Sequence, residues 1–169
     1  MFLGGPFCAT LTVMPATRFA HVVEVVGARG AGQDRARVFE RDAGIVIALA
    51  DGAGGTGNGA IAAEAIIDAV GAADPGVDWS MLLADVDEDG KRLGGGQSTV
   101  VVLSIAASGI VGASVGDSGA WSIRGSDVID LTEGQTRKPL VGSGCVPLAT
   151  AARTATLELH DAARQHAGE

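Results

Sequence analysis

Residues 44–59 read GIVIALADGAGGTGNG, and this stretch decides the fold around it. The apolar run before Asp51 predicts a buried strand, so Asp51 places a carboxylate at a strand end. The glycines that follow let backbone carbonyl and amide groups approach an ion or a phosphate closely. The segment therefore predicts a functional loop in which Asp51 is the central acid.

The composition predicts one globular domain with a single core. The chain has 169 residues, of which 47% are hydrophobic and 19% charged. This length suits one domain, and this composition is not that of a disordered chain. Because aromatic residues are only 4% of the chain, we expect a core of Val, Ile, Leu and Ala.

The charge balance argues against nucleic acid and anionic membranes as partners. Twelve Lys and Arg against twenty Asp and Glu give a net charge of −8, which repels a phosphate backbone. A chain this acidic needs cations to handle a phosphate ester. The charge therefore predicts a bound metal ion.

The cysteines and the hydropathy predict a soluble, cytoplasmic protein. Cys8 and Cys145 are too few and too far apart for a disulfide framework or a zinc site. The start of the chain lacks a basic region followed by a long apolar run, and no stretch of eighteen apolar residues occurs.

Hydrophobic periodicity predicts two helices between two groups of antiparallel strands. The expected helices cover 59–73 and 79–93, and Asp78 is the expected N-cap of the second. The expected strands are 19–26, 36–40, 44–50, 98–105, 110–115, 120–124 and 127–131. Helices that separate two sets of antiparallel strands indicate an α+β fold, with two sheets covered by helices.

Four acidic side chains near the end of the second helix are expected to form its solvated face. These residues are Asp85, Asp87, Glu88 and Asp89. Surface carboxylates are far commoner than metal sites, so we assign them no chemistry.

The glycine loop has two further interpretations. Gly52 to Gly57 also match the GxGxxG fingerprint of dinucleotide-binding folds, between a strand and a helix as that motif requires. Against it, Asp51 would lie beside a pyrophosphate of like charge, and the flanking strands resemble hairpins. The other interpretation is a tight turn in which Asp51 only caps the next helix.

Three more glycine-rich segments favour a shared site. Arg29 stands five residues before Asp34 in a loop after a strand, and Gln33 precedes Asp34. The segment Gly96-Gln97-Ser98-Thr99 opens a strand, and Gly116-Asp117-Ser118-Gly119 lies at a bend between two strands.

This ordered set resembles the PP2C or PPM family of metal-dependent protein serine/threonine phosphatases. The family has, in order, Arg-x-x-x-x-Asp, Asp-Gly-x-Gly-Gly, Gly-x-Ser/Thr-Thr and Gly-Asp-Ser, and the resemblance runs from about Arg29 to Val141. It implies an α/β/β/α sandwich of antiparallel sheets flanked by helices, here incomplete at the C-terminus. Gln33 departs from the family, in which many members have Glu.

The resemblance also implies roles for individual residues. Asp51 matches the carboxylate that bridges two Mg²⁺ or Mn²⁺ ions, and the carbonyl of Gly52 matches a ligand of one of them. Arg29 matches the residue that grips the substrate phosphate, with a solvated surface arginine as the alternative. Asp34 matches an acid near the metal cluster. Asp117 matches a ligand of a third, weaker metal, with a turn-forming aspartate as the alternative.

The implied reaction is direct hydrolysis of phosphoserine or phosphothreonine in proteins by a metal-activated water. The expected partners are phosphoprotein substrates, with a serine/threonine kinase or its targets. Neither cysteine has an arginine six residues later, so the Cys-x5-Arg loop of another phosphatase class is absent.

The C-terminal part of the sequence departs from the family pattern. The two later aspartates that the family takes from Ser-Asp-Gly and Asp-Asn segments are not in this sequence. We expect a partial phosphatase domain over 1–148, and over 149–169 an Ala-rich amphipathic helix ending in a polar tail. The alternative function is therefore a catalytically impaired module that binds a kinase or another partner. Unpaired sheet edges also predict a homodimer.

Overall fold

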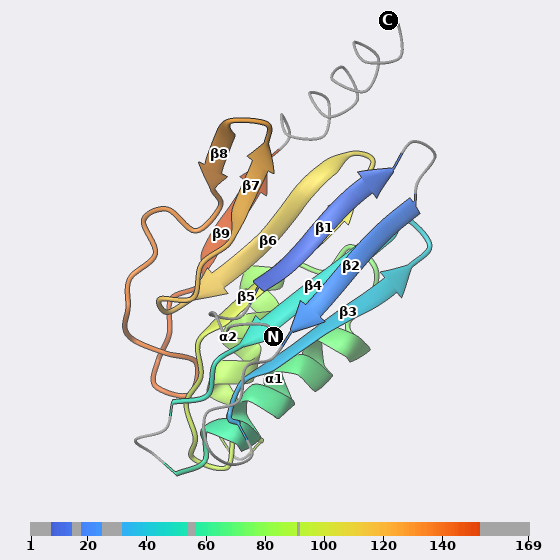
Figure 1. Ribbon diagram of the computed structural model, residues 1–169. Helices are drawn as coiled ribbons and strands as arrows, with labels where there is room; N and C mark the ends of the chain where they lie inside the picture. Colours follow the sequence, from blue (N-terminus) through green and yellow to red (C-terminus); the bar gives the residue numbers. More distant parts are fainter. Residues whose placement is uncertain (1–7, 15–17, 25–31, 54–56, 91, 153–169) are drawn as a thin grey trace, which may run out of the picture.

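Two helices and three antiparallel sheets make up the part of the chain described by the computed structural model, which is residues 8–14, 18–24, 32–53, 57–90 and 92–152 (Figure 1). The elements in chain order are β1 (Cys8–Met14), β2 (Arg18–Glu24), β3 (Arg35–Arg41), β4 (Gly44–Ala50), α1 (Gly59–Ala72), α2 (Trp79–Glu88), β5 (Val100–Ala106), β6 (Gly109–Val115), β7 (Trp121–Arg124), β8 (Asp127–Asp130) and β9 (Leu148–Ala152). The α+β class predicted from the sequence is confirmed.

The main sheet has the strand order β3-β4-β5-β6-β9, and every neighbouring pair is antiparallel. The register pairs Arg35 with Ala50, Leu49 with Val101, and Val100 with Val115. The start of β3, the end of β4, the start of β5 and the end of β6 therefore meet at one end of the sheet. Asp34, Asp51, Thr99 and Asp117, one residue from each of the four predicted motifs, flank these strand ends.

Both helices cover the same face of the main sheet (Figure 1). Alternate residues of β4 and β5 point toward the helices, because successive side chains of a strand lie on opposite faces. The core between helices and sheet is built mainly from Ala, Val, Ile and Leu, and includes Ala48, Ala50, Ile66, Ile67, Val70, Leu83, Val86, Val100, Val102 and Val115. The predicted core of small and aliphatic side chains is confirmed.

A second core lies on the opposite face of the main sheet. Its buried members are Ile45, Val101, Leu103, Ile105 and Leu131. Leu131 follows the β7–β8 hairpin, and its N–H donates to the Ala120 carbonyl over 2.8 Å. The β1–β2 hairpin also lies on this side in Figure 1, and β2 contacts β3. Burial on both faces explains why β4 and β5 read as continuous apolar runs.

The sequence prediction missed β1 and made the second helix too long. The second helix ends at Glu88 and not at Leu93, because the chain turns at Asp89 and enters a glycine-rich segment in which Gly94 and Gly95 have positive φ angles. Its N-cap is Asp78 as predicted, and the Asp78 carboxylate accepts from Ser80 N over 2.9 Å.

The predicted C-terminal helix does not begin at Ala149. Residues 148–152 instead form β9, which pairs with β6 from Ser114↔Leu148 to Ile110↔Ala152. The pairing partner overrides the helical propensity of the alanines. Residues 153–169 lie outside the described residues, and the division at residue 148 remains a prediction.

The topology decides against the dinucleotide-binding interpretation. That fold places its glycine loop between a strand and the crossover helix of a parallel βαβ unit. Here β4 pairs antiparallel with both β3 and β5. In the described part of the chain, neither helix is long and apolar enough to cross a membrane.

Candidate functional site

The backbone of Asp51 is locked between β4 and the start of β5. Its N–H donates to Thr99 Oγ1 over 3.2 Å, and its carbonyl accepts from Thr99 N and Ser98 Oγ, both over 2.9 Å. Ser98 and Thr99 are both buried. Asp51 itself is exposed, so a rigid backbone presents its carboxylate to solvent at the end of the sheet.

Gly52 is buried because the loop packs against the start of α1. A Cβ at this position would lie 2.4 Å from the backbone carbon of Gly59 and 2.9 Å from the Gln33 carbonyl oxygen. Gly52 also forms an isolated antiparallel bridge with Ser98. Only glycine fits here, which explains the Asp-Gly pair and brings the Gln33-Asp34 segment, the Asp51 loop and α1 together.

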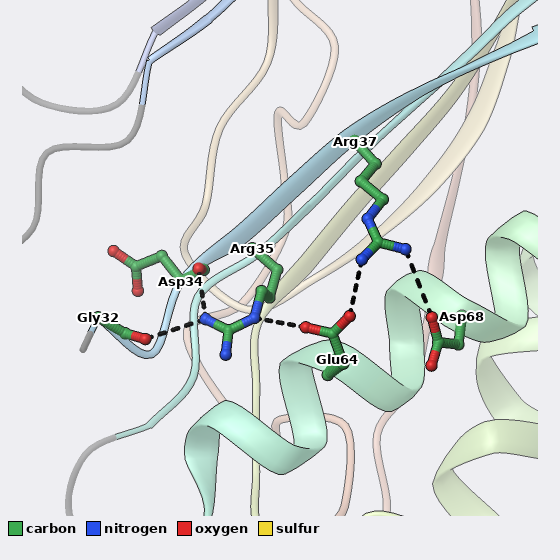
Figure 2. Close-up of polar contacts among 6 residues, drawn as sticks. All are labelled: Gly32, Asp34, Arg35, Arg37, Glu64 and Asp68. Carbon is green, nitrogen blue, oxygen red and sulfur yellow. Dashed lines mark hydrogen bonds and ion pairs between the residues drawn. The ribbon is translucent and has the colours of Figure 1, made fainter.

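Asp34 lies beside Asp51, as the β3–β4 register requires. Arg35 holds the backbone of this segment: its guanidinium Nη1 donates to the carbonyls of Gly32 and Asp34, both over 2.9 Å, and its Nε donates to Glu64 on α1 over 2.6 Å (Figure 2). Figure 2 shows the Asp34 carboxylate pointing away from Arg35. The arginine therefore fixes the chain of Asp34 and leaves its carboxylate available to the site.

The carboxylates concentrate negative charge at this end of the sheet. Although Asp51 is exposed as a residue, neighbouring protein atoms partly desolvate its carboxylate; this, with a hydrogen bond to Asp34 and the charges of Asp34 and Asp117, raises the pKa of Asp51 from 3.8 to about 6. Asp117 approaches from the turn after β6. Next to it, Ser118 Oγ lies 2.6 Å from Thr99 Oγ1, which joins this turn to the Asp51 segment.

A cavity of about 270 Å³ lies at this site. Its lining combines acidic, basic and polar residues, namely Asp51, Ala53, Gln97, Thr99, Asp117, Arg137, Lys138 and Leu140. A larger hollow of about 850 Å³ lies along α1 and includes Ile61, Leu82 and Arg92. We place the candidate site in the smaller cavity, because the larger one contains neither Asp51 nor Asp117.

The structure thus brings together Asp34, Asp51, Gly52 and Asp117, while Arg29 lies outside the described residues.

Sequence reasoning missed Arg137 and Lys138. The Arg137 guanidinium Nε pairs with Asp117 Oδ2 over 3.0 Å, and both residues line the cavity with Lys138. An adjacent Arg-Lys pair in a chain of net charge −8 was the available signal.

The predicted solvated acidic face is wrong for Asp87. Its carboxylate is half-buried and accepts hydrogen bonds from Gly142 N, Ser143 N, Gly144 N and Cys145 N. Four converging backbone donors organise the loop that follows the site segment. Asp85, Glu88 and Asp89 are exposed as predicted.

The donor chemistry of the site fits a hard divalent cation. Carboxylate and carbonyl oxygens are the ligands that Mg²⁺ and Mn²⁺ favour, and a cation would offset the desolvation and the repulsion between carboxylates that raise the pKa of Asp51. In the part of the chain that the structure describes, however, no group of three or more His, Cys, Asp or Glu side chains is arranged to hold a metal ion. The oxygen donors are therefore of the right kind, but they do not surround one point.

The sequence matches no protein-family model and no curated protein. Solved bacterial phosphatases share its fold. The S. agalactiae serine/threonine phosphatase has a TM-score of 0.62 at 19% identity over 87% of this chain and 74% of that chain. The Staphylococcus aureus serine/threonine phosphatase Stp1 has a TM-score of 0.57 at 17% identity, over 91% of this chain and 74% of that chain.

A Mycobacterium tuberculosis serine/threonine phosphatase has a TM-score of 0.56 at 17% identity, covering 86% of this chain and 72% of that chain. Another similar structure, with a TM-score of 0.53 at 17% identity, is the catalytic domain of the phosphatase PstP in complex with two manganese ions; it covers 87% of this chain and 72% of that chain. Across the similar structures, this chain spans 66 to 74% of their length. The chain therefore has the fold of the PP2C-type bacterial serine/threonine phosphatases.

Proposed function

We propose that this protein hydrolyses phosphoserine and phosphothreonine in proteins, with Mn²⁺ or Mg²⁺ as cofactor. The observation that supports this most is the position of Asp51. It directly follows β4 of a PP2C-type sheet, beside Asp34 and Asp117, at a cavity of about 270 Å³. The similarity to solved serine/threonine phosphatases supports the same reaction class.

In this proposal, Asp34, Asp51, Asp117 and the Gly52 carbonyl would hold the cofactor, two ions and a weaker third, once their oxygens converge on it. When bound, the cations supply a nucleophilic water and neutralise charge on the phosphoryl group. The protein contributes rigidity: Thr99 and Ser98 fix the Asp51 backbone, and Arg35 fixes that of Asp34. Arg29 binds the substrate phosphate. We place this activity in the cytoplasm, with a kinase or its targets as partners.

The test is hydrolysis of p-nitrophenyl phosphate with and without Mn²⁺, by the wild type and by Asp51→Asn. We expect metal-dependent turnover that the substitution abolishes without unfolding the protein. Asp42→Asn is the matched control, because Asp42 is exposed in the β3–β4 turn at the opposite end of β4. Full activity in Asp51→Asn would contradict the site assignment.

The second candidate function is a metal-binding module without turnover, which regulates a kinase or another partner by binding. Two observations favour it: Asp117 is paired with Arg137, and the described residues contain no complete group of metal-binding side chains. No turnover in the wild type, with Mn²⁺ raising its Tm but not that of Asp51→Asn, would support this candidate.

We also propose a homodimer through the sheet edges, and a monomeric elution profile at high concentration would argue against it.

A further inference from the structure

Two adjacent cations line the candidate site, and a metal-binding role does not explain them. Arg137 and Lys138 share the cavity of about 270 Å³ with Asp51, Thr99 and Asp117. Neither cation can be a metal ligand, because guanidinium and ammonium groups are donors only. What these side chains can bind in the cavity is therefore an acceptor group and not a cation.

The segment that carries both cations is anchored at each end. On one side, Gln135 Nε2 donates to the carbonyl and hydroxyl of Ser114, which is fully buried in β6. On the other side, Leu140 is buried, and Val141 forms an isolated bridge with Ser98 at the start of β5. Residues 136–139 thus span the cavity between two fixed points of the main sheet.

The ion pair of Arg137 with Asp117 leaves most of the guanidinium available. It uses the Nε donor over 3.0 Å, and a guanidinium has five N–H donors in a planar fork. The Arg137 side chain is 83% exposed and that of Asp117 is 52% exposed, so this pair adds little to folding stability. The pair places the guanidinium beside Asp117 at the cavity.

We propose that Arg137 is a phosphate-binding residue of this site, with Lys138 adding positive charge beside it. A planar guanidinium matches two oxygens of a phosphoryl group, and the site otherwise presents negative charge to that group. Arg137 thus contacts the phosphoryl oxygens of a group that enters the cavity it shares with Asp51 and Asp117. The assignment rests on the proposed phosphatase function for its biological meaning, but the binding itself can be measured without turnover.

The experiment measures the affinity for inorganic phosphate by isothermal titration calorimetry in excess Mg²⁺. Arg137→Gln should weaken phosphate binding by about tenfold, as expected for one charge-assisted contact. Arg137→Lys should recover part of the loss, because lysine keeps the charge but not the fork. Arg92→Gln makes the same charge change at an exposed residue of the other hollow and should leave the affinity unchanged.

Circular dichroism of each variant separates this result from misfolding. Equal phosphate affinity in the wild type and in folded Arg137→Gln overturns the proposal, whether or not p-nitrophenyl phosphate is hydrolysed. No measurable phosphate binding by the wild type also overturns it. A loss of affinity in Arg137→Gln, with no hydrolysis by the wild type, supports the Arg137 assignment while contradicting the proposed phosphatase activity. If the wild type is active, the loss should appear as a higher KM.

Discussion

The hydroxyl oxygens of Thr99 and Ser118 lie 2.6 Å apart, and this hydrogen bond joins the start of β5 to the turn after β6. Thr99 Oγ1 also accepts from the backbone N–H of Asp51 over 3.2 Å. One buried hydroxyl therefore connects the segments of Asp51 and Asp117.

Replacement of Thr99 by valine should destabilise the protein by about 1–3 kcal/mol, because it leaves the Asp51 N–H and the Ser118 hydroxyl without their partner. Valine keeps the shape of the side chain, so the loss reflects hydrogen bonding. Urea denaturation measures the free energy of unfolding. Thr136→Val, at an exposed position, is the control. Equal small changes in both variants would contradict the connecting role of Thr99.

Without metal, Asp51 should make the stability of the protein fall with rising pH. The folded pKa of about 6 exceeds the ordinary 3.8, so the folded state binds this proton more tightly than the unfolded chain. The contribution of this proton to the free energy of unfolding is complete below pH 3.8 and is lost as the pH rises through about 6.

Urea denaturation in EDTA, at pH values from 4 to 7, tests this sign. Asn mimics the protonated acid, so the stability of Asp51→Asn relative to the wild type should increase over this range and then level off. A stability difference that does not change with pH would show that the pKa of Asp51 is not raised.

Arg35→Gln should lower the pKa of Asp51 toward its ordinary value. The substitution removes the contacts that hold the backbone of Asp34, so Asp34 can move away from Asp51. A carboxyl ¹³C NMR titration of the metal-free protein measures this pKa directly.

The matched control for that titration is Arg37→Gln. Arg37 also pairs with Glu64, over 2.9 Å, and with Asp68 over 3.6 Å (Figure 2). Unlike Arg35, it does not donate to the carbonyls of Gly32 and Asp34. The pKa of Asp51 should stay near 6 in this variant. Loss of a positive charge by itself would raise the pKa of a carboxyl group, not lower it. The same decrease in both variants would therefore contradict the role of Arg35 in positioning Asp34.

Asp87→Asn should destabilise the loop 142–145 and make Cys145 more reactive. The two carboxylate oxygens of Asp87 accept from the four backbone N–H groups of this loop, whereas an asparagine side chain has only one acceptor oxygen. Burial, and then the Asp87 carboxylate, raise the pKa of the Cys145 thiol to about 12, which suppresses formation of the reactive thiolate. Removal of the Asp87 charge should lower this pKa and restore part of the reactivity.

The measurement is the rate of iodoacetamide alkylation at pH 8 in a Cys8→Ser background, so that only Cys145 is counted. Asp85→Asn removes an exposed acid of the same helix and should leave the rate unchanged. An unchanged rate in Asp87→Asn would show that burial alone suppresses the thiol.

Much of the fold followed from local pattern. The β3–β4 and β5–β6 hairpins, α1 after the glycine loop and the Asp78 cap all lie where period and turn residues predict them. The failures have a common cause. The alanines of β9 have helical propensity, and Asp87 has the pattern of a surface acid, but both positions are decided by distant segments: β6 for one and residues 142–145 for the other.

By itself, the sequence determined that Asp51 ends a buried strand before a glycine loop, because alternation, apolar runs and glycine act over a few residues. The order of its motifs also identified the fold. Only the tertiary structure decided that Asp34 lies beside Asp51, that Arg137 pairs with Asp117, and that Asp87 is an anchor. These relations depend on strand register and on where loops return to the sheet, which are set by contacts between residues far apart in the chain.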